Sequence, residues 1–132
     1  HEYGHILLGH IDWYRKWIKD GIKTHSIPTI TLHNFEYEAD IFAIKALEKI
    51  NLPNHFLRKI MYYFFSLLHI AEYDLPEVEI LNLRVTHPMV EKRLNNAFIH
   101  CGGLHTENDA FTALDAITKY VEISREYMEL DQ

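Results

Sequence analysis

The residues best suited to chemistry open the chain, where His1, Glu2 and His5 form an H-E-x-x-H pattern. Residues four apart share one face of a helix, so the imidazoles of His1 and His5 can bind the same metal ion, with Glu2 directed into the same cleft. A catalytic zinc ion usually takes three protein ligands and leaves a fourth position to water. The pattern therefore requires one more ligand downstream.

A second acidic pattern supplies a candidate for that ligand. Glu36 and Asp40 are four apart in a helical stretch, so Glu36 can reach the metal while Asp40 accepts the second ring N–H of a ligating histidine. The chain between His5 and Glu36 is long enough for one helix to end, a loop to turn back and a second helix to cross beside the first. Glu38 points away from this face by about 160–200°, and we expect it to be exposed.

The two patterns resemble those of the gluzincin zinc metallopeptidases, in particular the HtpX-like and CAAX-prenyl-protease-like branch, in which HExxH is followed by ExxxD. The segment 86–94, T-H-P-M-V-E-K-R-L, resembles the T-H-P-x-x-x-x-R segment of that branch. The ImmA/IrrE-type peptidases and the phage-exclusion protease Lit share the plan of HExxH and a downstream acidic helix. The resemblance covers residues 1–94 and implies a mainly α, zincin-like fold.

Carried over residue by residue, the resemblance implies a zinc endopeptidase that acts on a protein or peptide. The implied zinc ligands are His1, His5 and Glu36. Glu2 would be the general base, and Asp40 the carboxylate behind a ligating histidine. His87 and Arg93 would lie near the cleft, one to stabilise the oxyanion and the other to pair with a carboxylate. Each has a purely structural alternative: a local hydrogen bond at a helix start for His87, and a salt bridge for Arg93.

Composition narrows the classes of function. The 132 residues suit a single domain, 1–132, with one core. The formal net charge is −6 and no Lys/Arg cluster occurs, which argues against binding nucleic acid phosphates. The single cysteine, Cys101, excludes an internal disulfide and fits a reducing cytoplasm. The longest apolar stretch, 60–71, is shorter than the roughly 20 residues that a membrane span needs.

The spacing of apolar residues predicts about five helices. The first covers 1–19, with Trp13 and Trp17 in the core, and a loop follows to residue 33. The second runs from Asn34, as N-cap, to residue 50. The third covers 55–72 and is apolar nearly all the way round, which predicts the most buried helix.

The remainder of the chain predicts an exposed loop and two further helices. The loop covers 73–85. Thr86 caps the fourth helix, with Pro88 in its first turn, and Gly102 and Gly103 end it. The fifth runs from about 106–109 toward Met128.

Two questions stay open at this level. Because a zinc ligand is the first residue, we expect a segment upstream of His1, including the small sheet that binds substrate in the related peptidases. Two other functions are compatible with the pattern: a regulatory peptidase of the ImmA/IrrE or Lit kind with one protein target, and a non-catalytic helical interaction domain. A Glu2 substitution would leave every function of the latter unchanged.

Overall fold

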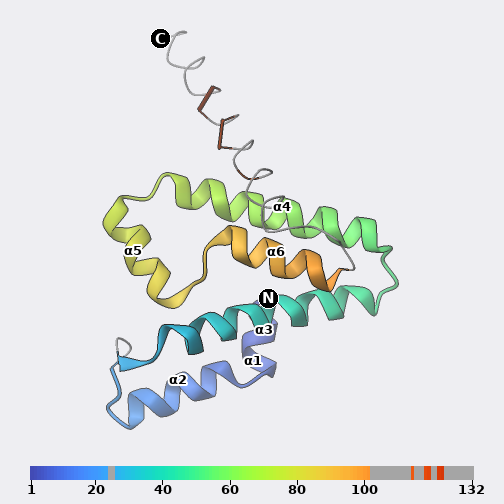
Figure 1. The fold of residues 1–132 in the computed structure, drawn as a ribbon. Coiled ribbons are helices and arrows are strands. Elements are labelled where there is room, and N and C mark those ends of the chain that lie inside the picture. The colour runs from blue at the N-terminus through green and yellow to red at the C-terminus, as the bar shows by residue number, and fades with distance from the viewer. Residues whose placement is uncertain (24–25, 102–113, 115–117, 120–121, 124–132) are drawn as a thin grey trace.

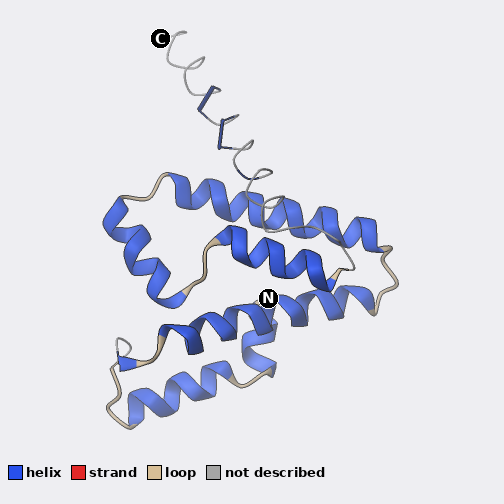
Figure 2. Cartoon of the chain, viewed as in Figure 1, coloured by secondary structure: helices blue, strands red, loops and turns tan. Residues whose placement is uncertain are grey.

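The computed structural model describes residues 1–23 and 26–101, together with residues 114, 118–119 and 122–123. These residues form α-helices and no β-strand (Figure 2). The mainly α fold expected from the sequence is confirmed. No helix in the described part of the chain is long and apolar enough to cross a membrane.

The described residues contain six helices. In chain order they are α1 (Glu2–Leu7), α2 (His10–Lys19), α3 (Thr29–Glu48), α4 (Asn54–Tyr73), α5 (Glu77–Thr86) and α6 (Val90–His100). Figure 1 shows α6 between α3 and α4, while α1 and α2 cover the opposite side of α3. Helix α5 links α4 to α6 and also touches α3. Helix α3 is therefore the element that joins the N-terminal helices to the rest of the fold.

The hydrophobic core lies between α3, α4 and α6. Its members from these helices and from the chain just beyond them are Ile44, Leu57, Met61, Phe65, Val90, Leu94, Ala97, Phe98, Cys101 and Leu114. Burial of such side chains contributes about 1.5–3 kcal/mol each. Cys101 is a free, buried thiol, as expected of a packing residue. The core thus fixes the position of α3 against α6, which between them carry several of the candidate site residues.

The first helix of the prediction is in fact two helices. Gly9 adopts a left-handed conformation with φ 76° and ψ 14°, so the chain turns between α1 and α2. Glycine reaches this region without the steric cost that a Cβ would bring. Trp13, expected in the core, is 50% exposed, whereas Trp17 is half-buried and stacks on Phe35 with ring centroids 6.0 Å apart.

Proline marks the start of three helices, and two of these starts, those of α3 and α5, differ from the prediction. Three helices have proline as the N-cap residue: Pro28 before α3, Pro53 before α4 and Pro76 before α5. The fixed φ of proline suits a helix start, where its missing N–H costs no hydrogen bond. Helix α3 therefore begins at Thr29 and not at Asn34, and the loop before it is shorter than expected.

Two other boundaries differ. Residues 77–86 form α5, where an exposed loop was expected; two acidic residues in its first turn interact favourably with the helix dipole. Thr86 ends this helix, and α6 starts at Val90, after Met89. The expected stop at Gly102 and Gly103, and most of the expected fifth helix, lie outside the described residues.

Helix α4 matches its predicted range, but the expectation that it is buried all round is wrong. Leu57, Met61 and Phe65 face the core. On the other side, Tyr63 and Leu67 are 65% and 68% exposed. Among the six helices, α4 packs mainly against α6 and also contacts α3, so these neighbours cover one side of it (Figure 1).

Candidate metal centre

The site starts from a close approach of α1 to α3. Gly4 is buried against Ala39: a Cβ on Gly4 would lie 3.0 Å from the Ala39 Cα and 3.1 Å from its carbonyl oxygen. These distances are tighter than nine in ten real Cβ contacts, so a larger residue would require the helices to shift by a few tenths of an ångström. Because His1 lies three residues before Gly4 and His5 directly follows it, the contact holds both imidazoles over α3.

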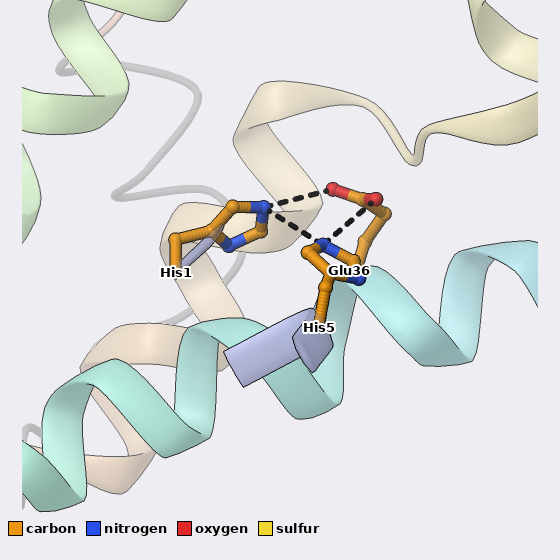
Figure 3. Close-up of side chains that lie close together, drawn as sticks. All are labelled: His1, His5 and Glu36. Atoms are coloured by element: carbon orange, nitrogen blue, oxygen red, sulfur yellow. Dashed lines mark hydrogen bonds and ion pairs between the residues drawn. The ribbon is translucent and has the colours of Figure 1, made fainter. Parts of the chain in front are cut away.

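The three predicted metal ligands come together at this crossing. Figure 3 shows His1 and His5 from α1 and Glu36 from α3 pointing toward one another. The Nε2 atoms of His1 and His5 are 3.1 Å apart. Glu36 places Oε2 3.4 Å from the His1 Nε2 and Oε1 3.4 Å from the His5 Nε2.

The distances of 3.1 and 3.4 Å are close to the roughly 3.3–3.4 Å between ligand atoms that lie about 2.0–2.1 Å from a tetrahedral zinc ion. The two 3.4 Å distances end on different oxygens of Glu36, and one ligand atom from each residue lies within 4.8 Å of the other two. Glu36 Oε2 is buried and accepts no hydrogen bond from the described residues, and its ion-pair partner is the Nη1 of Arg93, 3.2 Å away. The guanidinium offsets part of the cost of burying this carboxylate. Two imidazoles and a carboxylate are a donor set typical of zinc and also accepted by other divalent transition metals.

Asp40 lies behind the first histidine. Its Oδ1 is 2.8 Å from the Nδ1 of His1, so the Nδ1–H donates to the carboxylate and Nε2 faces the metal position. Arg93 of α6 donates to the same carboxylate through Nε at 2.9 Å and Nη2 at 2.8 Å. The predicted pairing of Arg93 with a carboxylate is thereby found. Because Asp40 binds both His1 and Arg93, these contacts connect the start of α1 with α3 and α6.

The electrostatic field at the site is set by two buried carboxylates and one guanidinium. Burial lowers the pKa of His1, but its contacts with Asp40 and Glu36 outweigh burial and raise the pKa to about 9. Burial lowers the pKa of His5, which favours the neutral imidazole that binds metals. Burial would raise the pKa of Glu36 and of Asp40, but His1 and Arg93 outweigh it and hold both values below the usual range. The negative charges of Asp40 and Glu36, which favour a proton on His1, also favour a bound dication.

The two predicted catalytic groups lie at the open side of the site. Glu2, His87 and the ligands His1 and Glu36 all line one cleft of about 470 Å³. Glu2 is 90% exposed in its side chain, and its Oε1 is 3.9 Å from the His1 Nε2. His87 is 39% exposed, with Nε2 3.6 Å from the Glu36 Oε1. The apolar part of the wall comes from α4, α5 and the turn between them, and the charged side chains of Glu72 and Arg93 complete the lining.

Helix α5, absent from the prediction, fixes the backbone that leads to His87. Arg84 forms an ion pair with Glu72 of α4, and its Nη1 donates to the Pro88 carbonyl at 3.3 Å. The Nε2–H of His33 in α3 donates to the Arg84 carbonyl at 2.9 Å. His87 itself bonds locally to Thr86, with Nδ1 2.6 Å from Oγ1. His87 therefore makes the local hydrogen bond of the structural alternative and also lines the cleft.

Sequence reasoning missed one member of the site, His10, and with it the partner of Glu38. The Nδ1 atoms of His10 and His5 are 3.0 Å apart, and the His10 Nε2 is 3.0 Å from the Glu38 Oε2. In a single helix His10 would lie about 140° round from His5, so the turn at Gly9 is what brings them together. The glycine between Leu8 and His10 was the signal available in the sequence.

No protein-family model matches this chain, and a search of curated proteins and of solved structures also finds no match. The geometry of the metal centre is therefore the basis for a function.

Proposed function

We propose that this chain carries the zinc centre of a metalloendopeptidase, which hydrolyses peptide bonds in a protein or peptide substrate. The single observation that carries the proposal is the set of three ligand atoms, from His1, His5 and Glu36, that lie within 4.8 Å of one another at a cleft edged by Glu2. Two histidines one helical turn apart with a glutamate between them match the requirement for a metal site with an adjacent general base.

The roles follow from position. Zinc bound there would supply a Lewis acid for the scissile carbonyl and a bound water with a pKa near ~7. Glu2, exposed at the cleft edge, accepts a proton from the attacking water and returns it to the leaving amine. His87, at the open side of the cleft, donates a hydrogen bond to the developing oxyanion. Asp40 and Arg93 are buried and orient the ligands.

The test begins with zinc per chain, measured by elemental analysis on the purified protein, on Glu36→Ala and on Glu2→Gln. We expect one zinc in the parent, retained by Glu2→Gln and lost or strongly weakened in Glu36→Ala. Loss in Glu36→Ala with retained helical circular dichroism would identify Glu36 as a ligand. A parent that binds no zinc while folded would overturn the proposal.

A peptidase assay then separates catalysis from metal binding. Against a peptide library, Glu2→Gln should lower the rate by a factor of about 10²–10⁴, because a general base contributes that much. The matched control is Glu48→Gln, on an exposed acid at the end of α3 outside the cleft, which should keep the parental rate. Equal activity in Glu2→Gln and the parent would exclude Glu2 as the base.

A further inference from the structure

His10 and Glu38 form a chain of hydrogen bonds that ends on the ligand His5. His10 is 2% exposed, and its ring stacks on Phe35 with centroids 4.2 Å apart and an angle of 11° between the planes. Glu38 closes the outer end of the chain from the next helix, with its side chain 57% exposed. A buried histidine held at both ring nitrogens and on one face has a fixed orientation.

The direction of the protons follows from the site. If the His5 Nε2 faces the metal, its proton is on Nδ1, and this N–H must donate to the atom 3.0 Å away, the His10 Nδ1. The His10 proton is then on Nε2, from which it donates to the Glu38 Oε2 at 3.0 Å. Each group in the chain has one compatible role, donor or acceptor, so Glu38 selects the tautomer of His10, and His10 selects that of His5.

We infer that His10 is a positioning residue for the metal centre, which holds His5 in the tautomer and orientation that bind a divalent metal through Nε2, with Glu38 as its anchor. The inference rests on the proposed function. It gives the second histidine ligand a support comparable to the one that Asp40 gives His1: one histidine is held by a buried carboxylate, the other by a buried imidazole backed by a carboxylate.

The arrangement also accounts for the break between α1 and α2. Glycine at position 9, with φ 76°, lets the chain turn so that His10 returns to the outer side of His5. The stack of His10 and Trp17 on Phe35 then attaches α2 to α3 at this point. The same contacts that dock α2 therefore orient a metal ligand.

The experiment measures the zinc dissociation constant by chelator competition for the parent, His10→Leu, His10→Gln and Glu38→Ala. Leucine fills the space but accepts no hydrogen bond, so His10→Leu should weaken zinc binding about 10–100-fold, the usual cost of losing the partner of a ligating histidine. Glutamine offers an amide oxygen to the His5 N–H, so His10→Gln should recover most of the affinity. Glu38→Ala removes an exposed side chain, spares the fold and should weaken binding several-fold.

The matched control is His69→Leu, which removes a half-buried histidine hydrogen-bonded to Thr118, outside the metal centre. It should keep the parental dissociation constant. If His10→Leu folds and binds zinc with the parental affinity, the inference is overturned while the metal centre stands. If His10→Leu does not fold, parental affinity in Glu38→Ala has the same consequence. Equal losses in His10→Leu and His10→Gln would also overturn it, since packing would then be the cause. Absence of zinc binding in the parent would overturn the metal centre itself and this inference with it.

Discussion

Gly4 of α1 and Ala39 of α3 touch backbone to backbone, and this contact sets the distance between the two halves of the metal centre. A Cβ at position 4 would meet the Ala39 Cα at 3.0 Å. The atoms that would be struck belong to the backbone, which cannot move aside as a flexible side chain can. The glycine inside the H-E-x-x-H pattern is therefore a condition of the ligand geometry.

The first prediction is that Gly4→Ala separates α1 from α3 and disrupts the site. We expect a loss of about 1–3 kcal/mol in the free energy of unfolding, typical of an overpacked contact, and a zinc dissociation constant raised at least tenfold. Urea denaturation and chelator competition measure the two quantities.

Gly21→Ala is the control for this substitution. Gly21 has φ 72° and no atom near its missing Cβ, so alanine there is strained but distant from the ligands. It should reduce stability and leave zinc affinity unchanged. Parental zinc affinity in Gly4→Ala would contradict the structural role of this contact.

Helical spacing of four predicted that His1 shares a face with His5 and Glu36 with Asp40. The place of Arg93 beside them was implied by the resemblance alone, and the structure brings all five residues together. The sequence was not sufficient for His10, whose position depends on one backbone conformation at Gly9 that spacing does not encode. The same limit explains the helix boundaries. Tertiary contacts and proline N-caps, more than apolar periodicity, decide where α3 and α5 begin.

The second prediction concerns the buried pair of Asp40 and Arg93, whose side chains are 2% and 6% exposed. Asp40→Asn removes the carboxylate that accepts two hydrogen bonds from the buried guanidinium, which keeps only its ion pair with Glu36 at 3.2 Å, and should cost on the order of 3 kcal/mol of unfolding free energy. The double variant Asp40→Asn with Arg93→Met removes the guanidinium as well. It should be more stable than the sum of the two single losses predicts, as a double-mutant cycle would show. Strictly additive losses would mean that the pair is not coupled.

The third prediction is a pH dependence of stability in metal-free protein. The pKa of His1 rises from 6.5 to about 9 in the folded chain, so its contribution to stability is complete below pH 6.5 and is lost as the pH rises through 9. The depressed pKa values of Glu36 and Asp40 act in the opposite direction: their contribution is present near neutral pH and is lost as the pH falls through the folded values. Chelator-treated protein should therefore be most stable between the acid transition and pH 6.5. In His1→Gln, the decline between pH 7 and 10 should be smaller than in the parent, and an unchanged decline would assign it to other groups.

The fourth prediction is that zinc stabilises the fold through these ligands. A metal that binds only the folded chain adds about 2.7 kcal/mol at a free concentration one hundred times its dissociation constant. Thermal unfolding of the parent should therefore shift upward with added zinc and return with a chelator. Glu36→Ala should show little shift, since it lacks one of the three ligands, whereas Glu2→Gln should shift as the parent does because Glu2 is not a ligand. An equal zinc-dependent shift in Glu36→Ala and the parent would place the bound metal elsewhere on the chain, because the carboxylate that lies 3.4 Å from both ligating histidines would then contribute nothing to binding.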